Sequence, residues 1–249
     1  MLELRGVSRH FGGVKAVDGL DLSVKQGQIF GLIGPNGSGK STTVNLISGL
    51  FPLTSGSIVF QEEDLEKLPT HLRLRAGIAR TFQNIRLFGQ LSVWQNLWVA
   101  QNSPADRARQ GFVARWLGGQ RGVREEIAQL LEFSGLAHKA EELAGNLAFG
   151  EQRRLELARA MAAKPKLLLL DEPAAGMNSE EIGQLRERIL KLRERGVTIL
   201  LVEHVMELVM GVTDRIAVLN FGQKIAEGTP AEVQADPAVR KAYLGGSVA

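Results

Sequence analysis

The sequence predicts an α/β fold with a parallel central sheet, an antiparallel β layer and an inserted helical subdomain. An apolar run at residues 29–33 leads through a glycine-rich turn into a helical segment, a pattern typical of parallel α/β sheets. Residues 2–8 and 17–24 alternate apolar and polar side chains, which indicates antiparallel strands. Helical periodicity dominates from about 84 to 144. We therefore expect one domain over 1–249, in which 1–83 and about 145–249 form the core and about 84–144 form the helical subdomain.

Composition limits the classes of protein to consider. The 249 residues are enough to bury a sizeable core, and 44% hydrophobic with 23% charged residues is typical of a globular protein. A formal charge of +3 gives no reason to expect nucleic acid as a partner. The absence of cysteine excludes disulfides and thiol chemistry. We find neither a signal-peptide pattern nor a run of about 20 apolar residues, so we expect a cytosolic chain whose contact with a membrane requires a partner.

The glycine-rich turn is predicted to bind phosphate groups. It reads Gly34-Pro35-Asn36-Gly37-Ser38-Gly39-Lys40-Ser41-Thr42, and we call residues 34–42 the phosphate loop. Backbone N–H groups at a helix N-terminus favour an anion, and Lys40 adds a mobile positive charge. The Ser41 hydroxyl is placed to bind magnesium. The alternative is an ordinary glycine-rich turn between a strand and a helix.

Two adjacent carboxylates follow a strand that is predicted to be buried on both faces. The strand predicted at 166–170 is apolar from Leu167 onwards, and Asp171, Glu172 and Pro173 come directly after it. Like charges repel at such a position, and no stabilising role for both is evident from the sequence. A divalent cation would remove the difficulty, with Asp171 as a ligand and Glu172 polarising an attacking water.

Three further residues are candidates at the ends of strands or turns. Gln83 follows the short strand predicted at 78–82, and His204 follows the strand predicted at 197–202, so both are expected at the edge where ligands bind in open parallel sheets. A surface histidine without a function is the alternative for His204. Phe11 is expected in a turn, where it could stack on a nucleotide base; a minor core residue is the alternative. The arginine-rich segment 101–124 is predicted to be a solvated loop, with contact to a membrane surface or partner as the alternative.

Together these motifs resemble, over the whole chain, the ATP-binding subunit of ABC transporters, whose fold is built on a P-loop NTPase core. The general resemblance rests on the phosphate loop, on Gln83, on a signature region at residues 147–152, on residues 167–173 and on His204. A narrower resemblance, to the branched-chain amino-acid importer group, rests on four stretches: RTFQNIRLF at 80–88, NLAFGEQRRLELAR at 146–159, DEPAAGMN at 171–178, and Ala242-Tyr243-Leu244-Gly245.

The resemblance implies ATP and Mg²⁺ as cofactors and a role for each matching residue. Glu172 would be the general base and His204 the γ-phosphate sensor, with Gln83 and Lys40 completing the catalytic set. Magnesium would be held by Ser41, Gln83 and Asp171. Phe11 would stack on adenine with Val17 nearby, and Gly150 would face the ATP of a second subunit. The phosphates would be bound by the phosphate loop, that is by Gly34, Pro35, Asn36, Gly37, Ser38, Gly39, Lys40, Ser41 and Thr42.

Three residues depart from the common superfamily pattern. Ala148 replaces the serine of the usual signature, although an alanine followed by an aromatic residue is normal for this importer group. Glu151 replaces a glutamine and places a carboxylate near an expected anion site. Asn178 replaces an aspartate and can still accept a hydrogen bond. We expect the first change to leave phosphate binding to backbone N–H groups, and the third to weaken communication between two ATP sites.

The resemblance predicts an ATP-hydrolysing subunit that powers an importer of branched-chain or other small amino acids. Its expected partners are a second ATPase subunit, identical or different, two membrane permease subunits and, indirectly, a substrate-binding protein. Its expected location is the cytoplasmic face of a prokaryotic plasma membrane. The alternatives are the ATPase of a urea or amide importer or of a lipid exporter, a soluble ABC ATPase outside transport, and a nucleotide-dependent scaffold without turnover.

Overall fold

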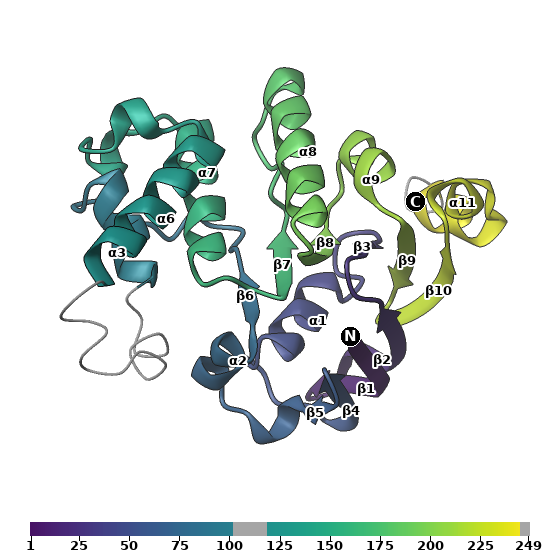
Figure 1. Cartoon of the computed structure of the whole chain (residues 1–249). Helices are drawn as coiled ribbons and strands as arrows, with labels where there is room; N and C mark the ends of the chain where they lie inside the picture. Colours follow the sequence, from purple (N-terminus) through teal and green to yellow (C-terminus); the bar gives the residue numbers. More distant parts are fainter. Residues whose placement is uncertain (102–118, 245–249) are drawn as a thin grey trace. The chain divides into compact units, whose positions relative to one another are not determined.

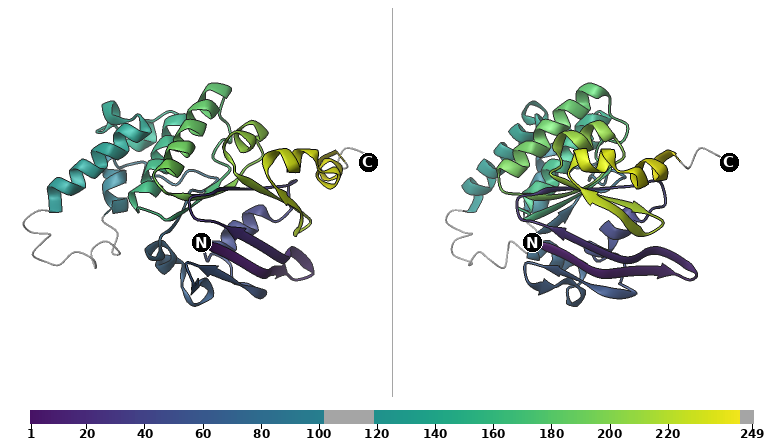
Figure 2. Two further views of the ribbon diagram at one scale, coloured as in Figure 1. Left: turned by 45° about the vertical axis from the view of Figure 1, so that its right-hand side comes forward. Right: turned by 90° about the vertical axis from the view of Figure 1, so that its right-hand side faces the viewer.

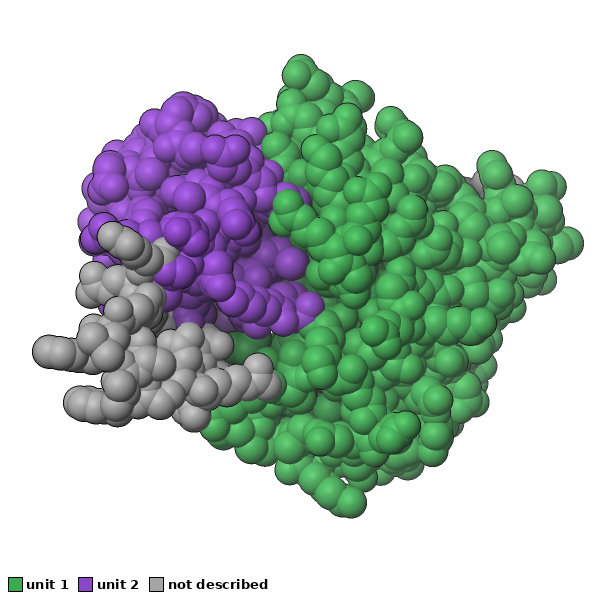
Figure 3. Space-filling model, viewed as in Figure 1, with its two compact units in different colours: residues 1–80, 166–249 green, residues 81–165 purple. Residues whose placement is uncertain are grey.

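The chain divides into two units, residues 1–80 with 166–249 and residues 81–165 (Figure 3). We describe them from a computed structural model, which covers residues 1–101 and 119–244. Most of the arginine-rich segment predicted at 101–124 lies outside the described residues. Within those ranges no helix combines the length and the apolar character that crossing a membrane requires.

A six-stranded sheet forms the centre of the first unit (Figure 1). Five of its strands are parallel and the sixth, β10, pairs antiparallel with β9. Every residue of the central strands β3, β7 and β8 is buried, which explains why the sequence of these strands is almost continuously apolar. In order across the sheet the strands are β10 (Gln223–Gly228), β9 (Arg215–Asn220), β3 (Ile29–Ile33), β8 (Thr198–Val202), β7 (Leu167–Asp171) and β6 (Ile78–Arg80).

A second, antiparallel sheet has the strand order β2-β1-β4-β5. Its strands are β1 (Leu2–Phe11), β2 (Val14–Val24), β4 (Ser55–Phe60) and the short β5 (Glu63–Asp64). The pairing continues through Phe11, which lies opposite Val14. The expectation that Phe11 lies in a turn is therefore wrong: the hairpin turn is confined to Gly12 and Gly13, both of which leave the strand geometry.

Helices cover both faces of the six-stranded sheet (Figure 2). On one face Phe30 and Leu32 of β3 pack into a core shared with α1 (Lys40–Ile47) and the antiparallel sheet. On the other face Ile33 packs with residues of α9 and α10. The remaining helices of this unit are α2 (Thr70–Ala76), α8 (Ser179–Glu194), α9 (Met206–Val212), α10 (Pro230–Ala235), α11 (Pro237–Leu244) and the 3₁₀ turn η1 (Leu65–Lys67).

The second unit is helical and has its own apolar core. Leu97, Ile127 and Leu155 meet in that core, one from each of three helices. The helices are α3 (Val93–Gln101), α6 (Gly119–Ser134) and α7 (Phe149–Ala162), and the 3₁₀ turns η2 (Ala137–Lys139) and η3 (Ala144–Asn146) lie between α6 and α7. The helical segment expected at 84–144 lies within this unit. The unit extends further, from 81 to 165, because α7 packs on α3 and α6.

Candidate functional site

The phosphate loop connects β3 to α1, and two of its glycines are sterically required. Gly34 and Gly39 have φ angles of +150° and +104°. A Cβ atom on Gly34 would lie 2.1 Å from the Leu219 carbonyl oxygen, and one on Gly39 would lie 2.4 Å from that of Ala16. No side chain fits at either distance, so the loop packs directly on β9 and on β2.

Lys40 is the first residue of α1 and its ammonium group turns back onto the loop. Nζ donates to the carbonyl oxygens of Gly34 at 2.8 Å and of Pro35 at 2.9 Å. Burial lowers the pKa of Lys40, while the nearby carboxylates of Glu172 and Asp171 raise it. The ammonium group therefore lies between the loop and the two acidic residues, where a phosphate group would find it.

The donor set of the loop fits a polyphosphate. The Ser38 hydroxyl is buried and makes no hydrogen bond to any described residue. Such a buried hydroxyl is costly unless a ligand pairs with it. The Gly37 residue, with φ +78°, has open space beside its Cα atom. A cationic side chain, an unused hydroxyl and a helix N-terminus thus converge on one place.

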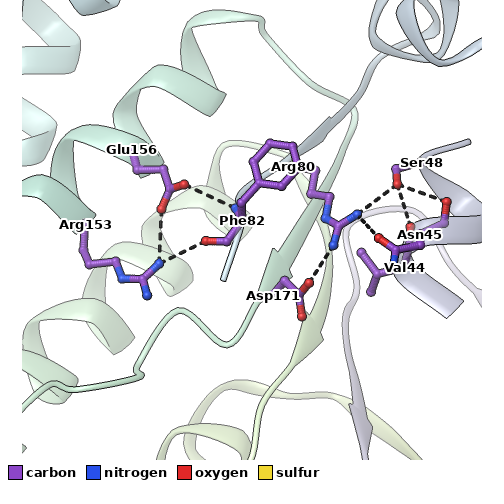
Figure 4. A network of polar contacts seen from close by, with 8 residues as sticks. All are labelled: Val44, Asn45, Ser48, Arg80, Phe82, Arg153, Glu156 and Asp171. Atoms are coloured by element: carbon purple, nitrogen blue, oxygen red, sulfur yellow. Dashed lines mark hydrogen bonds and ion pairs between the residues drawn. The ribbon is translucent and has the colours of Figure 1, made fainter. Parts of the chain in front are cut away.

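Asp171 ends β7 and is paired with Arg80, the last residue of β6 (Figure 4). Arg80 Nη2 lies 2.7 Å from Asp171 Oδ2, and both side chains are at least 90% buried. Arg80 Nη1 also donates to Asn45 Oδ1 at 2.6 Å and to Ser48 Oγ at 3.1 Å. The sequence argument that the two acidic residues lack a stabilising partner is therefore wrong for Asp171, because Arg80 supplies a positive charge.

Glu172 has a strained backbone. Its φ angle is +50°, a region that residues other than glycine, asparagine and aspartate rarely adopt. Its N–H donates to the Val202 carbonyl oxygen at 2.9 Å, which ties it to the end of β8. Strain of this kind is often found at functional sites, and here it turns the chain sharply just after a metal-binding candidate.

His204 lies just beyond the end of β8, in the same unit as the phosphate loop and the acidic pair. Its side chain is 57% exposed, and Nδ1 lies 3.6 Å from a carboxylate oxygen of Glu203. Since β8 lies between β3 and β7, the carboxyl ends of these parallel strands bring the phosphate loop, Asp171, Glu172 and His204 to one edge of the sheet.

Phe11 and Val17 have different surroundings. Val17 is fully buried, and its Cγ2 atom would lie 3.4 Å from a Cβ on Gly39, so it packs against the phosphate loop. Phe11 is 41% exposed and meets the Phe51 ring edge-on at 5.4 Å. The Arg9 guanidinium lies 4.5 Å from the centre of the Phe11 ring. The partly exposed ring is held in place by these neighbours and not by the main core.

Gln83 and Gly150 lie in the second unit, where α7 holds the backbone around Gln83. Arg153 donates to the carbonyl oxygen of Phe82 at 3.0 Å (Figure 4). It also donates to the carbonyl oxygen of Gln83 at 2.6 Å. Glu156 accepts from the Phe82 N–H and from Arg153, and burial raises its pKa. Gly150 is the second residue of α7, so the signature region forms the N-terminus of that helix.

A family model described as "ABC transporter" matches residues 17–175, which is more than half of the chain. The chain belongs to the ABC transporter family. Residues 223–249 of this cassette match a second model, described as "Branched-chain amino acid ATP-binding cassette transporter". The cassette is therefore a transport ATPase that binds ATP, in the branched-chain amino acid group of the family.

Relatives of the cassette match over nearly its full length. It is 43% identical to the high-affinity branched-chain amino acid transport ATP-binding proteins BraF of Pseudomonas aeruginosa and LivG of Escherichia coli, over 98% of each chain. A solved ATP-binding cassette of an ABC transporter in its ADP conformation has a TM-score of 0.86 and 31% identity, covering 98% of both chains. A dimeric bacterial ABC transporter cassette has a TM-score of 0.80 and 25% identity, covering 92% of this chain and 99% of that one.

The unusual residues of the cassette have local partners. Glu151 accepts from the Ala148 N–H at 3.1 Å and from Lys139 at 2.9 Å, and Lys139 holds the pKa of Glu151 below its ordinary value. The Glu151 charge is thus compensated within α7 and η2. Asn178 Oδ1 accepts from the Glu181 N–H at 3.0 Å and so caps α8. Its side-chain oxygen already serves a structural role that an aspartate would also fill.

Sequence reasoning missed two residues of the cassette that contact the predicted catalytic segments. Arg80 was noted only as part of a motif, although it pairs with Asp171. Glu203, directly before His204, was not singled out as a candidate, although it is fully buried. A charged residue at the end of an apolar strand was the available signal in both cases. The partner of such a charged residue depends on which strands are neighbours in the sheet, and the order β6-β7-β8 could not be predicted from the sequence.

Proposed function

We propose that this chain is the ATP-hydrolysing subunit of an importer for branched-chain or other small amino acids. The observation that carries the proposal is the match of residues 223–249 to the branched-chain cassette model, together with 43% identity to BraF and LivG over the full chain. The ATP-binding chemistry rests on the phosphate loop, and the choice of cargo rests on the relatives.

Nucleotide binding follows from the phosphate loop and its neighbours. The backbone N–H groups at the start of α1 and the Ser38 hydroxyl donate to phosphate oxygens, and Lys40 exchanges its two carbonyl partners for the outer phosphates. Ser41 and Thr42 continue the loop on the first turn of the helix. Val17 supplies an apolar contact beside Gly39, and Phe11 offers the exposed part of its ring to the base.

Ser41 and Asp171 fit a magnesium site as hydroxyl and carboxylate ligands, and Gln83 remains a predicted further ligand. Bound magnesium would neutralise charge on the phosphates. Arg80 holds one Asp171 oxygen at 2.7 Å. Asp171 would therefore bind the metal while paired with Arg80, directly or through water.

Hydrolysis assigns one task to each residue at the edge of the sheet. Glu172 accepts a proton from the attacking water. His204, which is exposed on its side chain, contacts the γ-phosphate. Lys40 stabilises negative charge that develops on that phosphate. Gly150 places the N-terminus of α7 against the nucleotide of a second subunit.

The proposed partners are a second ATPase subunit, identical or different, two permease subunits and a substrate-binding protein. A dimeric cassette among the similar solved structures supports the paired arrangement. The proposed location is the cytoplasmic face of a prokaryotic plasma membrane, where the permeases anchor the chain. ATP binding closes the paired subunits and hydrolysis resets them, which drives the permeases through their cycle.

Affinity capture tests the proposal. A tagged Glu172→Gln chain, trapped with ATP and magnesium, is isolated from detergent-solubilised native membranes, and a Lys40→Met chain that binds ATP poorly serves as the control. We expect two hydrophobic permease chains and an ATPase subunit, and a genetically linked binding protein that binds leucine, isoleucine or valine. Capture of permeases whose binding protein binds urea, or of a lipid exporter, would refute the assignment of amino acids as the transported substrate. Capture of ribosomal or DNA-associated proteins without permeases would refute the proposal that the chain is a transporter subunit.

A further inference from the structure

Glu203 is a fully buried carboxylate at the end of β8 that connects two separate segments of the chain. Its Oε1 atom accepts from the Ala174 N–H at 2.8 Å. Its Oε2 atom accepts from the N–H groups of His204 at 2.6 Å and of Val205 at 2.9 Å. The Glu203 side chain is 0% exposed. One carboxylate thus accepts from three backbone N–H groups, one in the segment after β7 and two in the segment after β8.

The two segments that Glu203 joins carry the predicted catalytic residues. Ala174 is two residues beyond Glu172, and His204 follows Glu203 directly. The strands from which the segments emerge, β7 and β8, are neighbours, with Asp171 opposite Val202. The Glu172 N–H donates to the Val202 carbonyl oxygen at 2.9 Å. Glu203 therefore extends the pairing of these strands beyond the end of the sheet, by means of a side chain.

A stabilising role alone does not explain a charged residue here. Burying a carboxylate is costly, and an apolar side chain of similar volume would fill the same space. Among the ion pairs of residues 1–101 and 119–244, the basic group facing Glu203 is His204 Nδ1, at 3.6 Å. The hydrogen bonds to its carboxylate come from backbone N–H groups. Only a carboxylate offers two acceptor oxygens in one plane, which is what binding both segments at once requires.

We propose that Glu203 is a positioning residue that fixes the Glu172 segment and His204 relative to each other. The inference rests on the proposed function, because it assigns these two residues to hydrolysis. The hydrogen bonds of its carboxylate go to backbone N–H groups of both segments. It acts through the backbone of Ala174 on one side and through the backbone of His204 on the other.

Glu203→Gln tests the inference with a change of one atom. An amide has one acceptor oxygen and one NH₂ group, so it satisfies either Ala174 or the His204 and Val205 pair, and presents a donor to the other. The oxygen should face the two donors, which leaves the Ala174 N–H opposite NH₂. We expect kcat for ATP to fall about 10- to 100-fold, the range for a displacement of about 1 Å, with KM within about twofold.

Two companion variants keep the test decisive. Glu203→Asp retains the charge but is one methylene shorter, so it cannot reach both segments, and it too should lower kcat. Asp214→Asn is the matched control, because Asp214 Oδ2 accepts the Ile29 N–H at 2.8 Å at the other end of the same sheet. This control should lower stability without lowering kcat. Hydrogen exchange of the Ala174 amide should accelerate in Glu203→Gln and stay unchanged in Asp214→Asn.

A double-mutant cycle separates positioning from simple stability. If Glu203 acts through His204 and the Glu172 segment, Glu203→Gln should cost much less in a His204→Ala background than alone. Equal losses in both backgrounds, or loss of kcat in Asp214→Asn to the same degree, would overturn the inference. If the wild-type complex itself does not hydrolyse ATP, the proposed function fails instead. The exchange of the Ala174 amide still tests the link made by Glu203.

Discussion

Replacing Arg80 by methionine should destabilise the first unit by several kcal/mol. The Arg80 guanidinium is 10% exposed and binds Asp171, Asn45 and Ser48, so it joins β6, β7 and the last turn of α1. Methionine fills much of the volume but leaves the buried Asp171 carboxylate without this cation. Removing one partner of a buried ion pair costs about 3–5 kcal/mol. We take this range as the expected loss in the nucleotide-free protein.

The assay is urea unfolding followed by far-UV circular dichroism. Tryptophan fluorescence would not report on this unit, because Trp94, Trp98 and Trp116 all belong to residues 81–165. Arg193→Met is the control, since Arg193 pairs with Asp214 at the surface, where both side chains are more than a third exposed. Such a pair contributes about 0–1 kcal/mol.

Adding Asp171→Asn tests the cause of the loss. The double variant should be more stable than Arg80→Met alone, because the uncompensated buried charge is gone. A loss in Arg80→Met no larger than in Arg193→Met would refute the reasoning. The reasoning would also be refuted if Asp171→Asn lowered the stability of the Arg80→Met protein further instead of restoring part of it.

Three further predictions concern the loop, the base and the pH dependence. Gly39→Ala should cost about 1–3 kcal/mol of stability through strain and should weaken ATP binding in a fluorescence titration, since its Cβ would lie 2.4 Å from the Ala16 oxygen; Gly183→Ala, with open space in α8, should be neutral or stabilising. Phe11→Ala should weaken ATP binding about 2- to 10-fold by loss of stacking, whereas Phe221→Ala, at an 85% exposed turn residue, should not; equal affinities for the Phe11 variant and wild type would reject the base contact. Lys139 lowers the pKa of Glu151 from its ordinary value of 4.5, so the ionised Glu151 side chain stabilises the fold above about pH 4.5, and this contribution is lost as the pH falls through the folded-state pKa. The difference in unfolding free energy between wild type and Glu151→Gln should therefore shrink on acidification. A difference that stays constant with pH would be contrary evidence.

Much of the fold was predictable because local signals and long-range packing agree. The run from Ile29 through the phosphate loop to Lys40 combines apolar burial, glycine at strained angles and a helix start, and all three specify the same strand–loop–helix unit. The apolar strand before Asp171 was recognisable for the same reason. In both segments the sequence motif and the pattern of apolar residues predict the same structure.

The parts that could not be predicted depend on contacts between distant segments. Arg80 meets Asp171 only because β6 pairs with β7, and Glu203 meets Ala174 only because β7 pairs with β8. Phe11 was placed in a turn because glycines follow it, yet the pairing of β1 with β2 continues to Val14 through several irregularities. Register of this kind is set by the whole sheet and not by the residues of one segment.

The most direct test of the central claim is phosphate release by the captured membrane complex, compared between wild type and Glu172→Gln. ATP affinity is measured on the same preparations, so that binding and hydrolysis are separated. The account predicts that wild type hydrolyses ATP faster when its binding protein carries a branched-chain amino acid. It also predicts that Glu172→Gln binds ATP with similar affinity and hydrolyses it about 10²- to 10⁴-fold more slowly, the contribution of a general base. Hydrolysis by Glu172→Gln at the wild-type rate would contradict it.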